Sequence, residues 1–483
     1  MNRRVAQRVV GLLLMVFSTT MLPPLAIWAL YQEGESLPFT AGFAITFLTG
    51  LFTWLPVRTD RSDLRLRDGF IIVVSFWTVL GAFGALPFAI STQPHLSVTD
   101  ALFESFSGLT TTGATVITGL DSLPKSILYY RQQLQWLGGL GIIVLAVAIL
   151  PMLGVGGMQL YRAETPGPIK DSKLAPRISE TAKSLWYVYA GLTVVCALSY
   201  WAAGMSLFDA VGHAFSTVAI GGFSTHDASI GWFDNNTINL LASLFMLIAG
   251  VNFAMHFVAF RSRGLSHYWE DTEFKAYLAL LLFGITVVFI GLMAYGHYSS
   301  GDHALINAIF QVISFATTTG FTTTDHANWP TALAILLLIS SFIGGCAGST
   351  AGGIKVIRVI LLFRQGVREL GRLVHPSAVI PVKMRHRVVD PRVIDAVWGF
   401  FAAYVGVFAL LLVIVVATGL DPMSAFAAVA ACMNNLGPGL GEVSSNMATL
   451  TDPAKWTLVL AMLLGRLEIF TLLVLFTPAF WRK

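Results

Sequence analysis

The sequence predicts an all-α polytopic membrane protein in which four tandem units, each a helix, a re-entrant pore loop and a second helix, surround a pseudo-fourfold pore. Composition, the lengths of the apolar segments and a recurring motif predict this fold. Hydrophobic residues make up 55% of the 483 residues and charged residues only 12%, against roughly 25% charged residues in soluble domains. So few charges cannot cover a water-facing surface, and the chain is therefore predicted to lie in a membrane.

A short polar segment that ends in glycine recurs four times in the chain. The four glycines are Gly113, Gly222, Gly320 and Gly437, at intervals of 109, 98 and 117 residues. Each segment follows an apolar stretch too short to cross a bilayer. This regular recurrence predicts one supersecondary unit of roughly a hundred residues, repeated four times.

Ten apolar segments are long enough to cross a bilayer, which takes about 20 helical residues. Their predicted ranges are 9–30, 40–56, 69–91, 128–153, 183–204, 235–260, 274–296, 331–363, 393–418 and 454–480. The first segment is long and lacks a cleavage pattern, so it is expected to be retained rather than removed as a signal peptide. Between alternate spans lie the four short stretches, at 99–110, 208–219, 304–316 and 423–434.

These spans divide the chain into five parts. Residues 1–66 form two N-terminal spans outside the repeats, and the repeats are predicted at 67–160, 161–263, 264–375 and 376–483. The second helix of the third repeat is expected to be broken, because it contains a glycine-rich segment.

Lys and Arg residues in short loops concentrate on the cytoplasmic side of a membrane. With the N-terminus inside, the inner segments hold 26 of the 30 Lys and Arg residues, and the exceptions are Lys125, Arg131, Lys455 and Arg466. Both termini are therefore predicted to be cytoplasmic, with the re-entrant loops on the outer side. The net charge of +4 follows from the inner loops and does not indicate nucleic-acid binding. The basic stretch from Arg364 to Arg392 is also a candidate docking surface for a regulator or anionic membrane lipid.

The re-entrant segments have the properties of a cation filter. A short helix ending near the membrane centre directs its partially negative carbonyl end toward the axis, which favours a cation. Backbone carbonyls after it can replace the water around an ion, and glycine permits the dihedrals that this requires. A single Thr/Gly segment is typical of an ordinary turn, but recurrence in register favours a ring of oxygens. The candidate ligand carbonyls belong to Thr111, Thr112, Gly113, Ile220, Gly221, Gly222, Thr318, Thr319, Gly320, Asn435, Leu436 and Gly437.

The four loop sequences resemble the filters of the bacterial Trk/Ktr/HKT potassium-transporter superfamily. They read SGLTTTGAT at 107–115, AIGGFST at 219–225, FATTTGF at 315–321 and NNLGPG at 434–439. The two extra N-terminal spans and the length make the chain most similar to the TrkH branch, over essentially its whole length.

This resemblance implies potassium (K⁺) uptake at the bacterial inner membrane, a homodimer with one pore per subunit, and a cytosolic TrkA-like nucleotide-binding regulator. The loops depart from the Thr-Val-Gly-Tyr-Gly filter of tetrameric channels and keep one common glycine each. A less selective pathway for potassium and sodium, or a cation-coupled symporter, is therefore an alternative.

A second glycine-rich segment, residues 344–353, lies within the span that follows the third filter. Its five glycines include Gly345, Gly348, Gly352 and Gly353, and each glycine costs about 1 kcal/mol relative to alanine inside a helix. A break is therefore expected, below the filter, where the resemblance implies an intramembrane gating loop. The alternative is close helix packing through the small residues spaced four apart.

Arg466 lies inside the last predicted span, where a charge is costly unless it faces water, a partner or a pathway. Facing the pore, it can repel cations or bind the carbonyls of the glycine-rich segment, a role that the resemblance supports. The alternative is a salt bridge. Glu468 is two residues away and lies on a different helix face, so Glu468 is a candidate partner for Lys355 or Arg358 instead.

Other polar residues in the apolar segments have simpler interpretations. Glu104 and His213 occupy equivalent positions in the first and second repeats, and are expected to anchor the filter, with proton coupling as the alternative. Asn252 and His256 lie on one helix face, and polar residues placed in this way commonly form contacts between spans. The three cysteines occupy unrelated positions, which predicts neither a disulfide framework nor a metal site.

The same residues argue against other classes of function. No glycine fingerprint for a dinucleotide follows a predicted strand, so nucleotide sensing is expected from a partner and no organic cofactor from this chain. An enzyme would need converging acids, nucleophiles or metal ligands in the bilayer, and none is evident. A secondary transporter of an organic solute remains an alternative, although its pocket would be built from side chains rather than backbone.

Overall fold

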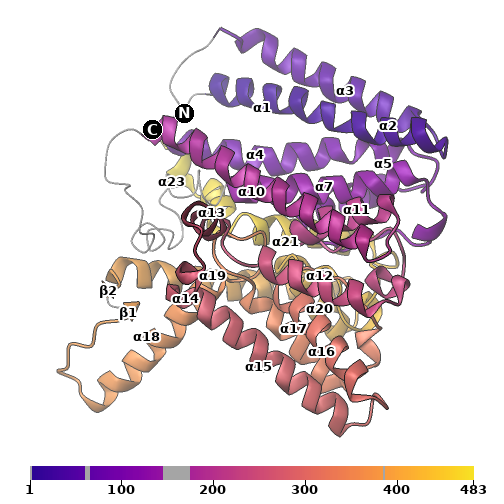
Figure 1. Ribbon diagram of the computed structural model, residues 1–483. Helices are drawn as coiled ribbons and strands as arrows, with labels where there is room; N and C mark the ends of the chain where they lie inside the picture. Colours follow the sequence, from indigo (N-terminus) through magenta and orange to yellow (C-terminus); the bar gives the residue numbers. More distant parts are fainter. Residues whose placement is uncertain (1–2, 60–65, 145–173, 385–386, 483) are drawn as a thin grey trace.

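The computed structural model describes residues 3–59, 66–144, 174–384 and 387–482 (Figure 1). The described residues are mainly helical, which confirms the predicted all-α membrane fold. The strands in the described part, β1 (Lys383–Met384) and β2 (Arg387–Val388), pair in one short antiparallel hairpin. The predicted boundary at 160/161 and the end of the span 128–153 lie outside the described residues.

Two spans precede the repeats. Helices α1 (Arg3–Ser18) and α2 (Leu22–Tyr31) form the first span, and α3 (Leu37–Trp54) returns beside α1. A methyl group added at Gly50 would lie 2.8 Å from the carbonyl oxygen of Gly11, so the two helices cross at a pair of glycines. Small residues at such a crossing let helix backbones approach closely in a membrane.

Each of the four repeats contains a first helix, a short re-entrant helix and a second helix. The first helices are α4 (Leu66–Gly84), α10 (Leu174–Ala202), α15 (Thr272–Ala294) and α19 (Pro391–Ala417). The re-entrant helices are α6 (Val98–Leu109), α11 (Leu207–Val218), α16 (Gly301–Ala316) and α20 (Pro422–Met433). The second helices are α7 (Lys125–Val144), α12 (Asn236–Ala249), α17 (Thr331–Ile343) and α21 (Asp452–Arg466). The other α-helices of the described residues are α5 (Leu86–Ile90), α13 (Phe253–Ser262), α14 (Ser266–Glu270), α18 (Val356–Val374), α22 (Phe470–Leu473) and α23 (Pro478–Trp481).

Three of the four re-entrant helices, α6, α11 and α20, begin at side-chain caps. Ser97 Oγ accepts a hydrogen bond from Asp100 N (3.1 Å), Ser206 Oγ accepts one from Asp209 N (3.1 Å), and Asp421 Oδ1 accepts one from Met423 N (2.9 Å). Such caps satisfy backbone N–H groups that have no partner within the helix. The sequence thus fixes where three of the short helices start.

The second helices are broken more often than the sequence analysis predicts. The spans 235–260 and 454–480 were expected to be continuous, but α12 and α13 meet at 94°, and α21 and the segment from α22 meet at 106°. Asn252 caps the start of α13, and Glu468 and Ile469 have positive φ, which ends α21. Within the described residues, six helices are long and apolar enough to cross a membrane, or up to eight if each bent pair counts as one span, rather than ten.

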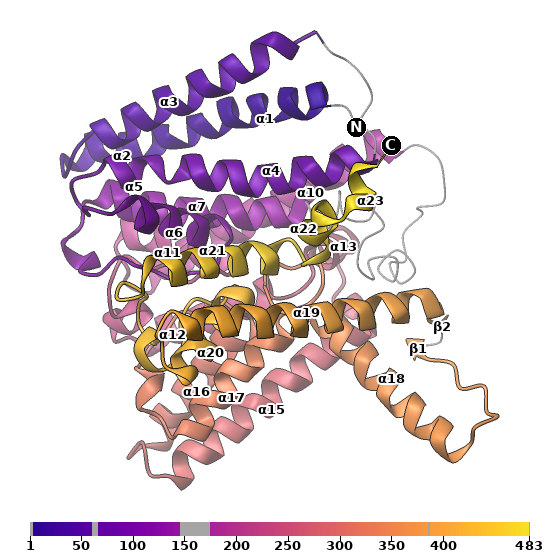
Figure 2. The same cartoon turned by 180° about the vertical axis from the view of Figure 1, so that it is seen from behind.

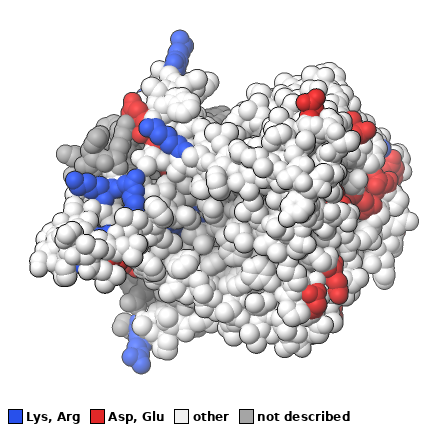
Figure 3. Space-filling model, turned by 90° about the horizontal axis from the view of Figure 1, so that it is seen from below, with Lys and Arg blue, Asp and Glu red and all other residues white. Residues whose placement is uncertain are grey.

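Charges separate along the long direction of the molecule. Lys and Arg side chains gather at one end and Asp and Glu side chains at the other (Figure 3); we refer to these as the basic end and the acidic end. Both termini and α18 lie at the basic end (Figure 1). Three of the four exceptional cations are paired with acids: Lys125 with Glu33 (3.0 Å), Arg131 with Glu104 (2.7 Å) and Lys455 with Asp100 (2.6 Å).

The buried pair between Arg131 and Glu104 is predicted to be important for stability. Their side chains are 1% and 0% exposed, so Arg131→Met leaves an uncompensated buried carboxyl group and should cost about 3–5 kcal/mol. Lys125→Met is the matched control, because the Lys125–Glu33 side chains are 34% and 44% exposed and such pairs contribute about 0–1 kcal/mol. Thermal unfolding in detergent measures both, and equal unfolding midpoints for the two variants would contradict the prediction.

Candidate functional site

The four polar loops meet in a closed ring. A methyl group added at Gly113 would lie 2.1 Å from the carbonyl oxygen of Gly221, and one at Gly222 would lie 2.1 Å from that of Thr319. At Gly320 the corresponding distance is 2.0 Å to the Leu436 oxygen, and at Gly437 it is 2.8 Å to the Thr112 oxygen. Each glycine therefore lies against the carbonyl oxygen of the residue that precedes the glycine in the next repeat. The glycine of the fourth repeat lies against the first repeat in the same way, which closes the ring. Eight of the twelve candidate ligand residues form these contacts, and the other four, Thr111, Ile220, Thr318 and Asn435, each directly precede one of the eight in the chain.

The four loops share one backbone conformation. The residue two positions before each glycine has a left-handed φ: 52° at Thr111, 53° at Ile220, 67° at Thr318 and 54° at Asn435. The four glycines have φ of 82°, 78°, 80° and 96° in chain order. Non-glycine residues rarely adopt this conformation, and its recurrence marks a functional constraint.

Backbone hydrogen bonds repeat in the same register. Thr112 N, Gly221 N and Thr319 N each donate over 2.8 Å to the carbonyl of the residue five positions earlier, and Leu436 N does so over 2.7 Å. Each bond ties a loop to the end of its own re-entrant helix. The ring therefore lies at the carbonyl ends of α6, α11, α16 and α20, where the helix dipole favours positive charge.

Anchors on the acidic side of the ring differ between repeats. Glu104 accepts from Val116 N (3.0 Å), His213 Nε2 contacts Ser224 Oγ (2.8 Å), and Gln311 Nε2 donates to Thr324 O (3.1 Å). These three residues each lie nine positions before their glycine, and the fourth repeat has Ala428 there. The geometry agrees with the anchoring interpretation of Glu104 and His213, and adds Gln311.

Helix α7 contributes two further supports that the sequence analysis missed. Arg131 Nη1 donates to Ser224 O (3.1 Å), in addition to its pair with Glu104. Gln135 donates to Gly221 O (2.6 Å) and accepts from Phe223 N (3.0 Å). These side chains of the first repeat thus fix the filter loop of the second. The sequence offered one indication of this support, because Arg131 is one of the four basic residues outside the inner segments.

The glycine-rich segment interrupts the membrane helix below the ring. Helix α17 ends at Ile343 and α18 begins at Val356, and we refer to residues 344–355 as the intramembrane loop. Gly344, Gly348 and Gly353 have φ of 73°, 74° and 73°. These residues are not helical, so the alternative of helix packing through glycines spaced four apart is wrong.

The intramembrane loop contacts three repeats from below. Gly352 N donates to Thr318 Oγ1 (2.7 Å), Gly353 N to Asn434 O (3.2 Å) and Thr350 Oγ1 to Val218 O (3.0 Å). A methyl group at Gly352 would lie 1.9 Å from Asn434 O. The loop therefore lies directly against the filter, on the side facing the basic end.

Arg466 lies at the end of α21 and contacts the intramembrane loop. Its Nη1 donates to Thr350 O over 3.1 Å, while its buried Nε and Nη2 atoms have no hydrogen-bond partner in the described structure. Arg466 forms no salt bridge within the described residues, whereas Glu468 pairs with Arg358, which is one of the two partners predicted for it. Arg466 is thus the one exceptional cation without a carboxylate partner in the described part of the chain, and it lies beneath the filter.

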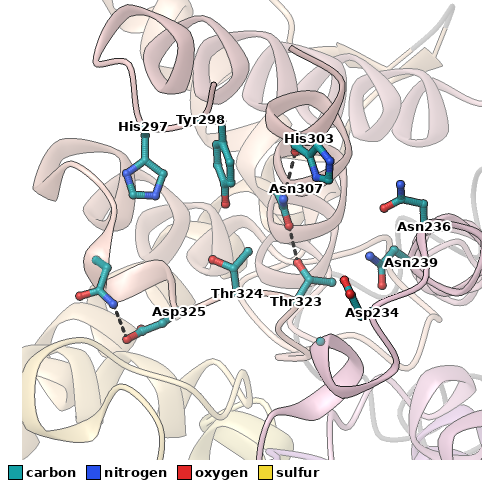
Figure 4. Close-up of a pocket in the computed structure, with 12 residues that line it drawn as sticks. Asp234, Asn236, Asn239, His297, Tyr298, His303, Asn307, Thr323, Thr324 and Asp325 are labelled. Atoms are coloured by element: carbon teal, nitrogen blue, oxygen red, sulfur yellow. Dashed lines mark hydrogen bonds between the residues drawn. The ribbon is translucent and has the colours of Figure 1, made fainter. Parts of the chain in front are cut away.

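The cavities formed by the described residues include two at the acidic end. One, of about 400 Å³, is lined by Gly113, Gly222, Gly320 and Gly437 and so lies over the ring. The other, of about 330 Å³, lies to the side and is shown in Figure 4. Its wall includes Asn307, which accepts a hydrogen bond from Thr323 (2.8 Å). We refer to the first cavity as the vestibule and to the second as the side pocket.

The remaining polar candidates have structural roles. Asn252 caps α13 through a bond from Ala254 N (2.9 Å), and His256 contacts Tyr268 Oη (2.7 Å) and Ile248 O (2.9 Å). Together they support the bend between α12 and α13. No group of three or more His, Cys, Asp or Glu side chains suited to a metal occurs in the described ranges.

The ring requires glycine at each close approach, and Gly222→Ala tests this. The added methyl group meets Thr319 O at 2.1 Å, and φ is 78°, so the variant should lose at least about 2 kcal/mol of stability. Gly406→Ala is the control, because nothing lies within 4 Å of a methyl group there, and alanine should stabilise that helix by about 0.5–1 kcal/mol. Thermal unfolding compares them, and a Gly222→Ala midpoint at or above wild type would refute the requirement.

Comparison with known proteins adds to this geometry. A family model described as a cation transport protein, TrkH, matches residues 35–483. The chain is 58% identical over 478 residues to the Trk system potassium uptake protein TrkH of Vibrio parahaemolyticus, covering 99% of each. It is 56% identical over 483 residues to the protein of the same name from Escherichia coli K12, covering 100% of each. The crystal structure of the potassium transporter TrkH from V. parahaemolyticus matches it with a TM-score of 0.93 at 55% identity, over 100% of both chains. The chain therefore belongs to the TrkH family of cation transport proteins.

Proposed function

We propose that this protein takes up potassium ions across the bacterial inner membrane, through a filter of backbone carbonyls whose opening is controlled by the intramembrane loop. The observation that carries the proposal is the closed ring of glycine–carbonyl contacts among the four repeats. Close relatives are named potassium uptake proteins, and the ring is the part of the chain best suited to that activity.

The ring has the chemistry needed to dehydrate a monovalent cation. Thr111, Ile220, Thr318 and Asn435 share one left-handed conformation with the four glycines that follow them, so equivalent carbonyls from four sides can replace the water around an ion. The ends of four helices add partial negative charge without a full carboxylate. A site of this kind favours a weakly hydrated monovalent ion over a divalent one, because no fixed charge compensates for full dehydration of a divalent cation.

We propose that the intramembrane loop and Arg466 form the gate. The loop lies against Thr318 and Asn434 below the filter, where backbone in the membrane is tolerated only if it is buried or lines a cavity. Arg466 adds a positive charge at the same level and donates to Thr350 O (3.1 Å). Permeation would require the loop to leave the pathway, and this movement would break the hydrogen bond between Thr350 O and Arg466.

The basic end is proposed to face the cytoplasm, with both termini inside and the vestibule outside, because basic residues concentrate on the inner side. Control is proposed to come from a cytosolic TrkA-like nucleotide-binding partner, since the described chain offers no nucleotide fold of its own. The basic stretch from Arg364 to Arg392 is the surface best suited to that partner or to anionic lipid. A homodimer with one pore per subunit completes the proposal.

Potassium and sodium flux into liposomes tests the filter and the gate together. The wild type, a Gly113→Ser variant and an Arg466→Ala variant are reconstituted without a partner. Gly113→Ser should lose the preference for potassium, because its side chain meets Gly221 O. Arg466→Ala should raise flux by about tenfold or more, because it removes a hydrogen bond from a charged group that contributes about 1.5–3 kcal/mol to the closed loop.

Gly406→Ala controls for the effects of glycine replacement, and its flux should match the wild type. Equal potassium and sodium flux through the wild-type protein would favour the less selective alternative. An absence of cation flux under any gradient, with a cytosolic partner also supplied, would refute the pore and favour a transporter of an organic solute.

A further inference from the structure

Glu273 is a buried acidic residue that contacts neither the filter loops nor Arg466 in the described structure. It lies in the first turn of α15, near the basic end, and is 7% exposed. Burying a carboxyl group in a membrane protein is costly unless the group is hydrogen-bonded, and such residues tend to be functional. Its partners therefore indicate what it does.

In the described residues, one carboxyl oxygen of Glu273 accepts hydrogen bonds from two backbone N–H groups. Oε1 accepts from Ala347 N over 2.8 Å and from Ile357 N over 3.1 Å. Ala347 belongs to the intramembrane loop, and Ile357 to the first turn of α18, where backbone N–H groups lack partners within the helix. One side chain thus joins α15, the intramembrane loop and α18.

These bonds lie on either side of the segment that contacts the filter. Gly352 and Gly353, which donate to Thr318 and Asn434, lie between Ala347 and Ile357 in the chain. The segment is also joined across its ends by a bond from Val356 N to Gly345 O (3.1 Å). Glu273 connects this segment to helix α15, as Arg466 connects it to α21.

Helix α18 projects away from the helix bundle at the basic end (Figure 2). It carries Phe363, Leu370 and Leu373 as exposed apolar side chains, at 72%, 65% and 79% exposure. Because Ile357 N and Ala347 N donate to the same Glu273 oxygen, a displacement of α18 relative to α15 would act on the side chain that holds the loop.

We propose that Glu273 is a positioning residue that keeps the intramembrane loop against the filter and couples it to α18. This inference rests on the gating role proposed above for the loop. The side chain touches neither the ion pathway nor Arg466 in any described contact; it acts through the two N–H groups. Loss of its acceptor oxygen releases the loop, whereas loss of its charge alone does not.

The exposure of Cys346 measures loop release independently of transport. Cys346 precedes Ala347 in the loop and is 2% exposed, while Cys196 in α10 is 0% exposed. Two backgrounds each keep one cysteine, either Cys346 or Cys196, with the other two of the three replaced by serine. The rate of modification by N-ethylmaleimide is followed by mass spectrometry of the purified full-length protein.

Glu273→Ala should increase the modification rate of Cys346 by about tenfold, which corresponds to about 1.4 kcal/mol, and should raise basal potassium flux in liposomes. Glu273→Gln keeps an acceptor oxygen in the same place, so both readouts should stay close to wild type. Lys275→Ala removes an exposed charge from the same turn of α15 and should change neither. Cys196 should stay unreactive in every variant, which separates release of the loop from general unfolding.

Unchanged modification of Cys346 in Glu273→Ala would overturn the inference, and so would Glu273→Gln behaving like Glu273→Ala. Modification of Cys196 in Glu273→Ala would also overturn it, because the residue would then support the whole fold rather than the loop. Failure of the proposed function has a different signature: no variant, including Arg466→Ala, conducts cations, while the cysteine measurement still reports on the loop.

Discussion

The centre of this fold depends on four places where a backbone carbonyl of one repeat approaches the glycine of its neighbour. These contacts leave no room for a side chain, since a methyl group at Gly113, Gly222 or Gly320 would lie within 2.1 Å of the oxygen. They require the four re-entrant helices to end at one level with their loops in one register. The caps, the buried Arg131–Glu104 pair and the Gln135 bonds all hold the loops to that register. The ion pathway that we propose, lined by backbone carbonyls, rests on this constraint.

Below the ring the repeats differ, and the gate that we propose is built from these differences. In the second and fourth repeats the second helix bends, while in the third it opens into the intramembrane loop. The intramembrane loop donates hydrogen bonds to Thr318, Asn434 and Val218. Moving the loop away from the ring would break these bonds. Arg466 and Glu273 bind the loop from two different helices. The position of the intramembrane loop against the ring therefore depends on side chains from α15 and α21, which are far from each other in the sequence.

The sequence predicted the all-α membrane fold, the repeats and the four loops that meet at the centre, because hydropathy, basic residues and glycine spacing are local patterns with direct physical causes. It did not predict the bends after Ala249 and Arg466, since the residues there, such as Val251 and Leu467, continue an apolar run. The sequence also did not predict the hydrogen-bond partners of Arg131, Gln135 and Glu273. Each binds backbone groups tens of residues away, and backbone groups carry no sequence signal. Arg466 was recognised in the sequence because a charge inside a span is rare. Its contact with Thr350 became evident only from the structure.

The most direct test of the account is anomalous diffraction from crystals of this protein grown in rubidium, which substitutes for potassium and scatters anomalously. The account predicts rubidium peaks on the axis enclosed by the carbonyls of Thr112, Gly221, Thr319 and Leu436. Rubidium bound only in the side pocket beside Asn239 and Asp234, with none within the ring, would contradict it, because the ion would then be held by side chains and not by the four repeated loops.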